Sequence, residues 1–171
     1  MVKRLLQRDP SLYFSVSAKT RAPRPGEVDG RDYRFISEEE FDDLIRRDAF
    51  LEWAEMFGHR SGTVADPVKE ALNEGRDVIL EIDVQGARTI RERVPDAVLV
   101  FIAPPSREEL TRRLRERGTE DERELAARFA AFDREMSEQD RFDHVVENDE
   151  LSRAADEVAA IIERYRSDRR N

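Results

Sequence analysis

The apolar residues of this chain fall into short runs and helical stripes that alternate along the sequence. Residues 12–17, 77–84 and 97–103 are apolar runs typical of strands. The last run is almost continuously apolar, which predicts a parallel strand buried on both faces. We predict helices over residues 2–9 and 86–93, from Ser37, from Asp66 to Gly75, from Ser106 to Gly118, onward to about residue 137, and along the stripe from Leu151 to Tyr165. This alternation predicts an α/β fold with a parallel sheet covered by helices on both faces.

Several of the predicted helix ends carry capping signals. A serine followed three residues later by a glutamate is a capping box, in which the serine side chain accepts a hydrogen bond from a backbone N–H of the first turn. An Asp-Pro pair is typical of an N-cap and the first helical residue, and a glycine commonly follows a helix end. The capping boxes are Ser37 with Glu40 and Ser106 with Glu109; the Asp-Pro pair is Asp66 with Pro67, and Gly75 ends that helix.

Residues 31–64 interrupt the alternation of strands and helices. Residues 32–36 form a short strand-like run, and residues 50–64 have the pattern of short strands or a hairpin around Gly58 and Gly62. The segment therefore predicts a small antiparallel insert in the parallel fold.

The composition bounds the class of protein. A length of 171 residues suits one domain, and 39% hydrophobic residues in ordered runs predict a real core. The net charge of −9 argues against a nucleic-acid binder. The chain has no cysteine, its two histidines are far apart, and no apolar run reaches about 18 residues. We therefore expect no thiolate or zinc site, no membrane partner and, since the first residues do not resemble a signal peptide, a cytoplasmic location.

Arginine is strongly preferred over lysine. Of the 30 basic residues only Lys3, Lys19 and Lys69 are lysines. A GC-rich coding sequence explains such a bias, and so does anion binding, because the guanidinium fork suits phosphate. The two explanations are compatible.

Polar residues follow two of the predicted strands at the edge where open parallel sheets bind ligands. Ser17 ends the first strand, and Glu81 with Asp83 ends the second, two residues apart and so on one face. Two carboxylates on an apolar strand are costly unless a magnesium ion or a hydrogen-bonding substrate neutralises them. A surface pair or a helix N-cap is the alternative interpretation.

A proline-rich loop follows Ser17 and carries Arg21 and Arg24. Its prolines keep it out of a helix, so both guanidinium groups are free to face one anion, with the hydroxyl of Tyr33 as a neutral donor. The pattern predicts a phosphate clamp, and a solvated loop with incidental charge is the alternative.

Two further features have a structural and a functional interpretation. Glu52 lies beside apolar residues in "LEWAE", where it is either a surface residue or a further carboxylate that takes part in the chemistry. Six arginines crowd a Glu-rich segment that is either a pair of salt-bridged helices or a mobile lid acting on phosphates. These arginines are Arg112, Arg113, Arg115, Arg117, Arg123 and Arg128.

The run "FSVSAKTRAPRPGEVDGRDYRF" at residues 14–35 resembles the signature of guanylate kinases. The blocks "FLEWAE", "GHRSGT", "VILEIDVQGA", "VFIAPPS", "RLRERGTED" and "VVEND" follow in family order and spacing, from about residue 2 to 165. The resemblance implies a nucleoside-monophosphate kinase of the P-loop class that transfers the γ-phosphoryl group of ATP, with Mg²⁺, to GMP or dGMP. It implies one domain over 1–171, with a core of 1–30, 65–117 and 138–171, a GMP-binding insert of 31–64 and a helical lid of 118–137, in a monomer or homodimer.

The resemblance also implies roles for individual residues. Three would hold the GMP phosphate and three would read the guanine, with the carboxylate of Glu52 accepting from its N1–H and exocyclic amine. Others would lie near the metal and GMP, act from the lid, or meet ATP. The phosphate residues would be Arg21, Arg24 and Tyr33, and the guanine residues Ser17, Glu52 and Thr63. Asp83 and Glu81 would lie near the metal and GMP, where Gly86 lets the backbone approach. The lid arginines would be Arg117 and Arg128, and Asn148 would lie on the ATP side.

The sequence departs from the family pattern at two positions of this site. Ser61 stands where many members have a tyrosine that contacts phosphate, so that contact is lost or replaced by Arg60. Lys19 stands where a threonine is usual, and we expect this change to be harmless.

The largest departure is the phosphate-binding loop G-x-x-x-x-G-K-[ST], which none of the seven glycines forms. We expect that about twenty residues, including the first strand, are missing through a late start site or a shortened chain, and that the chain as given lacks the means to hold ATP. The alternatives are a catalytically dead module that binds GMP or a phosphorylated peptide, and a remnant that does not fold stably.

Overall fold

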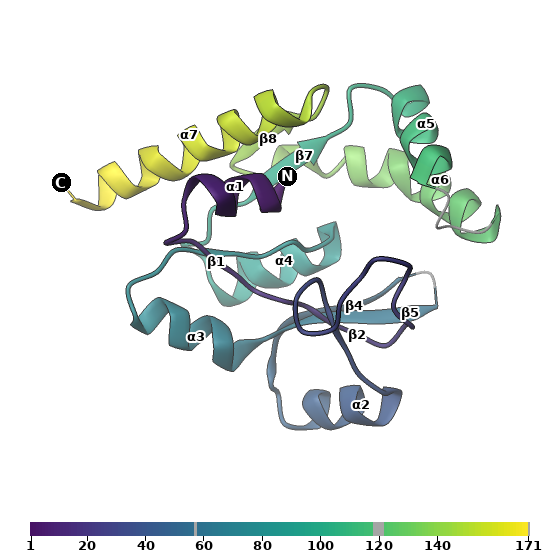
Figure 1. The fold of residues 1–171 in the computed structure, drawn as a ribbon, viewed down its shortest axis with the longest axis horizontal. Helices are drawn as coiled ribbons and strands as arrows, with labels where there is room; N and C mark the ends of the chain where they lie inside the picture. The colour runs from purple at the N-terminus through teal and green to yellow at the C-terminus, as the bar shows by residue number, and fades with distance from the viewer. Residues whose placement is uncertain (57, 118–121, 171) are drawn as a thin grey trace. The chain divides into compact units, whose positions relative to one another are not determined.

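The computed structural model describes residues 1–56, 58–117 and 122–170, and the chain divides into two compact units. One unit is Pro10–Ala97. The other combines Met1–Asp9 with Val98–Asn171. Figure 1 shows the helices and strands of both. Each unit contains a parallel pair of strands together with helices, so the predicted α/β class is confirmed.

The parallel strands of the unit Pro10–Ala97 are β1 (Tyr13–Phe14) and β6 (Val78–Ile79). They pair in parallel, with Tyr13 opposite Val78. The predicted runs 12–17 and 77–84 are thus strands only near their beginnings, since two residues of each make the ladder. The helices α3 (Ala65–Asn73) and α4 (Val84–Arg93) flank β6 in sequence.

The same unit contains a four-stranded mixed sheet in the order β3-β2-β5-β4. Its strands are β2 (Ala18–Lys19), β3 (Arg34–Phe35), β4 (Phe50–Met56) and β5 (His59–Val64). The β4–β5 hairpin was predicted, and Gly58 supplies the positive φ (76°) beside its turn. Gly62 instead lies inside β5. The sheet also takes in β2, which is upstream of the predicted insert and pairs in parallel with β3.

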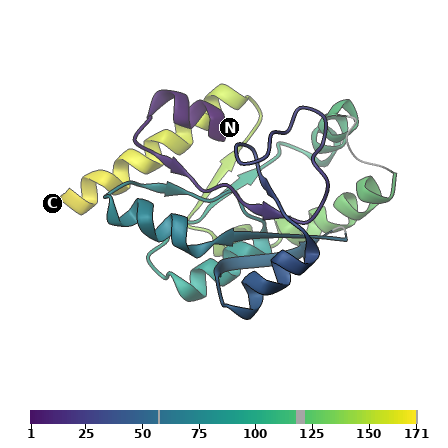
Figure 2. The same ribbon diagram turned by 60° about the horizontal axis from the view of Figure 1, so that its bottom comes forward.

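Helix α2 (Glu38–Arg46) covers one face of the mixed sheet (Figures 1 and 2). Its Phe41 is fully buried with Ala18 and Phe50, and the two phenyl centroids are 4.5 Å apart. The predicted cap is present, because the Ser37 hydroxyl accepts a hydrogen bond from the N–H of Glu40. We call this side of the sheet the helix face.

The prediction for the start of α3 was wrong by two residues. The N-cap is Val64, not Asp66, and Pro67 is the third helical residue. The reason is that β5 runs directly into the helix, with the N–H of Ala65 held by the carbonyl of Ala49. Pro67 is still tolerated, since first-turn N–H groups have no partner inside the helix. The predicted glycine stop is confirmed at Gly75, which has a φ of 76°.

The second unit contains the parallel pair β7 (Val100–Ala103) and β8 (His144–Glu147). Its helices are α1 (Val2–Arg8), α5 (Arg107–Arg117), α6 (Glu122–Met136) and α7 (Leu151–Arg170), with a 3-10 turn at Gln139–Arg141. Helix α1 lies along α7, where Arg166 pairs with Asp9 at 2.6 Å.

The expectation that residues 97–103 are buried on both faces was wrong. Leu99, Phe101 and Ala103 are buried, but Ile102 between them is 39% exposed. Buried and more exposed side chains alternate along β7, so only one of its faces is covered. The run therefore alternates like a strand with one solvated face.

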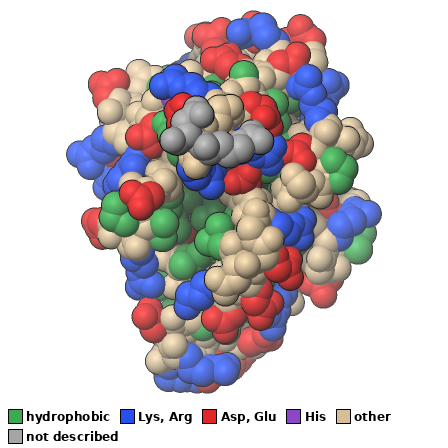
Figure 3. Space-filling model, turned by 90° about the vertical axis from the view of Figure 1, so that its left-hand side faces the viewer, with side chains coloured by type: hydrophobic (Ala, Val, Ile, Leu, Met, Phe, Trp, Pro, Cys, Tyr) green, Lys and Arg blue, Asp and Glu red, His purple; other side chains and the backbone are tan. Residues whose placement is uncertain are grey.

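The arginine-rich helices carry dense ion pairs. In α5, Arg112 binds both Glu109 and Glu116, and Arg113 also binds Glu109, so these guanidinium groups lower the pKa of the Glu109 carboxyl to about 2. Figure 3 shows acidic and basic side chains interspersed over one face of the molecule. The salt-bridged interpretation therefore holds for Arg112 and Arg113. The predicted Gly118 helix end lies outside the described residues, as do residues 118–121 of the predicted lid.

Within the ranges that the structure describes, no helix is both long and apolar enough to cross a membrane.

Candidate functional site

A β-bulge in β4 decides which way Glu52 points. Phe50 pairs with Val64 and Glu52 with Thr63, so Leu51 is an extra residue and the register shifts between them. Regular alternation would place Phe50 and Glu52 on the same face. Because of the bulge, Phe50 lies in the helix face against Phe41, and Glu52 lies on the opposite face.

That opposite face, which we call the site face, gathers residues from three strands. Lys19 of β2 is paired with Ser61 of β5, and Glu52 of β4 with Thr63 two residues along β5. Because side chains alternate along a strand, these four residues lie on one side of the sheet. Ser17, which is buried and immediately precedes β2, lies two residues before Lys19 and on the same side.

Glu52 is a buried acid and not a surface residue. It is only 5% exposed, and its Oε1 accepts a hydrogen bond of 2.6 Å from the Thr63 hydroxyl. Burial raises the pKa of the carboxyl, and the nearby charge of Asp83 raises it further, against the lowering effect of the Thr63 hydrogen bond. The site therefore holds a carboxylate that one more hydrogen-bond donor would stabilise strongly.

The first turn of α4 closes over Glu52. A Cβ placed on Gly86 would meet Glu52 Oε2 at 2.5 Å and the Cβ of Ile82 at 3.2 Å. Gly86 was predicted to let the backbone approach a ligand; in the structure its missing side chain leaves room for a carboxylate of the protein itself.

Asp83 is the N-cap of α4, and its Oδ1 accepts a hydrogen bond of 2.7 Å from the N–H of Gly86. The N-cap alternative therefore holds for this residue. Glu81 is exposed and follows the end of β6 by two residues, so neither carboxylate lies within the strand. In the described part of the chain, no group of three or more His, Cys, Asp or Glu residues could hold a metal ion.

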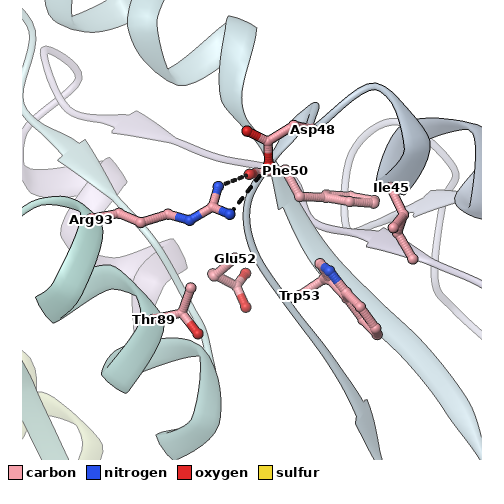
Figure 4. A pocket seen from close by; sticks show the side chains of 7 residues that line it. All are labelled: Ile45, Asp48, Phe50, Glu52, Trp53, Thr89 and Arg93. Carbon is pink, nitrogen blue, oxygen red and sulfur yellow. Dashed lines mark hydrogen bonds and ion pairs between the residues drawn. The ribbon is translucent and has the colours of Figure 1, made fainter.

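A small pocket of about 100 Å³ opens beside Glu52. Figure 4 shows the Arg93 guanidinium donating to the Phe50 carbonyl (2.8 Å) and to Asp48 (3.2 Å), with Glu52 and Thr89 nearby. Neither Thr63 nor Ser17 lines this pocket, so it touches the predicted guanine site from the α4 side without being that site.

The predicted phosphate clamp is a cluster of cations around an aromatic ring. The guanidinium carbon of Arg21 is 5.3 Å from the ring centroid of Tyr33 and 5.5 Å from that of Phe35. The Lys19 Nζ is 4.1 Å from the Tyr33 centroid. The structure therefore brings Arg21 and Tyr33 together on the site face, and adds Lys19, which the sequence analysis expected to be only a harmless change.

Glu27 organises the loop that carries the two arginines. Its carboxylate accepts two hydrogen bonds of 2.7 Å from the Arg21 guanidinium and one of 2.7 Å from the backbone N–H of Arg24. These bonds lower the pKa of Glu27, with the Arg21 bond as the largest cause. Sequence reasoning missed Glu27, although an acid three residues after Arg24 in a Pro-Gly turn was a usable signal.

Arg60 does not take the place of a phosphate-binding tyrosine at position 61. Its guanidinium stacks on the Phe41 ring at 4.7 Å and pairs with Glu38 and Asp42 of α2. Arg60 therefore lies on the helix face, whereas Ser61, the next residue along β5, lies on the site face.

The remaining predicted residues belong to the other unit. Arg128 is half-buried in α6, and the side chain of Arg117 lies outside the described residues. Asn148 follows β8, where its N–H donates to the Ala103 carbonyl and its own carbonyl accepts from Arg113, both at 2.7 Å. Among the described side chains, its Oδ1 is buried without a hydrogen-bond partner. The structure groups Arg128 and Asn148 in one unit and the base and phosphate residues in the other.

Comparison with known proteins identifies the family of the chain. A family model described as guanylate kinase matches residues 1–165. The chain belongs to the guanylate kinase family. The resemblance in the sequence is thereby confirmed, and with it a nucleotide-binding kinase of the transferase class.

Individual guanylate kinases are similar over most of their length. One from Nocardia farcinica is 50% identical over 163 residues, which cover 94% of this chain and 84% of the relative. One from Caldanaerobacter subterraneus subsp. tengcongensis is 47% identical, over 98% of this chain and 82% of the relative. The crystal structure of guanylate kinase from Anaplasma phagocytophilum matches with a TM-score of 0.81 and 32% identity, covering 96% of this chain and 79% of that one.

Proposed function

We propose that this guanylate kinase uses the site face to bind GMP or dGMP, which receives the γ-phosphoryl group of ATP to give GDP and ADP. One observation carries the proposal: a buried acid, Glu52 with its partner Thr63, shares one face of one sheet with the cationic cluster around Tyr33. A nucleotide that spans this face would place its base at the acid and its phosphate at the cations.

Glu52 and Thr63 supply the chemistry to select guanine, together with the buried Ser17. A carboxylate accepts two hydrogen bonds side by side, and guanine offers two adjacent donors on its Watson–Crick edge. Adenine offers a different edge and would bury the carboxylate without the two donors that guanine supplies, which is costly. The Thr63 hydroxyl holds one carboxylate oxygen, so the acid is already oriented before the base arrives.

Arg21, Arg24 and Tyr33 supply the phosphate clamp. Arg21 is held in a bidentate pair with Glu27, with its side chain only 11% exposed. A phosphate dianion would add negative charge to a site where cations outnumber the Glu27 counter-ion. Charge-assisted hydrogen bonds of this kind are about twice as strong as neutral ones.

The other unit would act on ATP. Arg117 and Arg128 would stabilise charge on the transferring phosphoryl group, and the buried Oδ1 of Asn148 is an acceptor available on the ATP side. Mg²⁺ bound with ATP would neutralise phosphate oxygens. The candidate protein ligands for this ion are Asp83, which already caps α4, and the exposed Glu81. These two residues suit an ion that phosphate oxygens and water would mainly hold.

Calorimetric titration with GMP, AMP and guanosine tests the proposal. We expect GMP to bind more tightly than AMP, through the base, and more tightly than guanosine, through the phosphate. Equal affinity for all three would reject it. Release of ADP that depends on GMP, measured in the same preparation, separates a kinase from the alternative, a module that binds GMP or a phosphorylated peptide without turnover.

The proposal extends to a monomer or homodimer that works in the cytoplasm. The acidic, cysteine-free composition supports this compartment, and gel filtration in the presence of GMP tests the oligomeric state.

A further inference from the structure

Two positions that differ from the family pattern face each other in the structure. Lys19 and Ser61 are 42 positions apart in the sequence, yet they are direct cross-strand partners in the β2–β5 ladder. Directly opposite side chains of an antiparallel pair lie within contact range of each other. The short serine side chain covers less of the site face beside the lysine than the tyrosine of many family members would.

The Lys19 ammonium group lies within the phosphate clamp. Its Nζ is 4.1 Å from the centroid of Tyr33, the same ring on which Arg21 stacks. A cation–π contact stabilises a cation that is partly removed from water. The lysine and the arginine thus share one aromatic surface on the site face.

Charges of both signs surround Lys19. Arg21 and Arg24 are its cationic neighbours. Glu27, Glu81 and Glu52 are acids whose charges act on it, and Glu27 is already engaged by Arg21 and Glu52 by Thr63. Burial lowers the pKa of the lysine, and the charge of Arg21 lowers it further. Neighbouring positive charges disfavour the protonated form of a lysine. A dianion that binds between these cations offsets their repulsion and stabilises the charged lysine.

We propose that Lys19, which is paired with the short Ser61 and lies over Tyr33, is a third cation of the clamp and binds the phosphate of the monophosphate substrate. This inference rests on the proposed function, because it assigns a further residue to the same site. It replaces the expectation that Lys19 is a harmless change. Lys19 would contribute to specificity, since it adds affinity only for ligands that carry the phosphate.

Calorimetric titrations of Lys19→Gln and Lys19→Arg with GMP and guanosine provide the first test. Loss of a charge-assisted contact predicts that Lys19→Gln binds GMP about 10- to 100-fold more weakly, with guanosine affinity unchanged, and that Lys19→Arg recovers most of the loss. Lys69→Gln is the matched control, because Lys69 is an exposed lysine on α3 of the same unit. Unchanged GMP affinity in Lys19→Gln would overturn the inference and leave the proposed function intact.

Chemical protection in the unmodified chain provides a second test that does not depend on a variant folding. The chain has only three lysines, so trace acetylation followed by mass spectrometry reports on each separately. We expect GMP to slow acetylation of Lys19 about 10-fold while guanosine does not, with Lys3 and Lys69 as internal references. Binding of GMP without this protection rejects the role of Lys19. A chain that does not bind GMP at all rejects the proposed function, and the inference with it.

Discussion

The carboxylate of Glu52 lies against the α-carbon of Gly86, so closely that a methyl group on Gly86 would be 2.5 Å from Glu52 Oε2. A residue at the start of α4 therefore determines the position of an acid on β4. The contact links the helix N-terminus to the part of the site that we propose reads guanine.

Gly86→Ala should weaken GMP binding at little cost in stability. The added methyl group would displace the flexible end of Glu52, while alanine favours the helix by up to about 1 kcal/mol over glycine. We expect a loss of GMP affinity of about 10-fold or more by calorimetry, with a urea unfolding midpoint that hardly changes. Gln85→Ala, an exposed neighbour in the same turn, is the control. Normal GMP affinity in Gly86→Ala would mean that the position of Glu52 does not matter for the base.

Gly62→Ala should have the opposite profile. Here the methyl group would meet the Phe50 ring and the Cβ of Trp53, both at 2.8 Å, in the packed helix face. Overpacking of this kind typically costs about 1–3 kcal/mol. We expect the free energy of unfolding in urea to fall by that amount, and a stability equal to that of the unmodified chain would show that the helix face is loosely packed.

Glu52→Gln should increase stability at neutral pH and weaken GMP binding. Because burial raises the pKa of Glu52 above its ordinary value of 4.5, its contribution to stability is fully present below that pH and is lost as the pH rises through the higher pKa of the folded state. Glutamine does not ionise, so the stability difference between variant and unmodified chain should grow from about pH 4.5 upward. Unfolding curves at several pH values measure it, and parallel curves for the two proteins would contradict the raised pKa.

The same substitution should alter base preference. An amide oxygen accepts from one guanine donor while its NH₂ opposes the other, so we expect a loss of about 1–3 kcal/mol for GMP and a smaller one for AMP. Titration of both nucleotides measures the difference. Equal losses would remove Glu52 from the guanine site.

Arg21→Ala and Arg24→Ala should abolish most of the affinity for GMP and leave the affinity for guanosine unchanged. The reason is that the clamp acts on the phosphate alone, and raised salt should reproduce part of the effect. Arg60→Ala is the matched control: it removes ion pairs with exposed partners on α2 and a contact with Phe41 on the helix face, so it should change stability but not GMP affinity. A loss of GMP binding in Arg60→Ala alone would place the phosphate on the helix face.

We expect the 171-residue chain to bind GMP but to phosphorylate it very slowly. Its sequence contains no G-x-x-x-x-G-K-[ST] loop to hold the β- and γ-phosphates, and the loss of a single preorganised donor costs about 100- to 1,000-fold in rate. Coupled ADP release at saturating ATP, Mg²⁺ and GMP tests this expectation. Turnover of at least about 1 s⁻¹, in the ordinary range for kinases, would mean that other residues form the ATP site.

The residue types and their local spacing were sufficient to predict much of this protein. The alternation of runs and stripes predicted the α/β class, and the Ser37 cap and the Gly75 stop follow from chemistry within one helical turn. Arg21 and Tyr33 of the loop were predicted to lie together, and the structure places the Arg21 guanidinium carbon 5.3 Å from the Tyr33 ring centroid. Such features depend on neighbours in sequence, so the sequence alone determines them.

Contacts between distant segments were decided only by the tertiary structure. The bulge at Leu51 turns Glu52 away from Phe50, the approach of α4 makes Gly86 necessary, and the β2–β5 register places Lys19 opposite Ser61. The burial of residues 97–103 was likewise set by which faces of β7 are covered, and not by how apolar the run is. Strand pairing and packing join residues tens of positions apart, and local periodicity carries no information about which of those residues will meet.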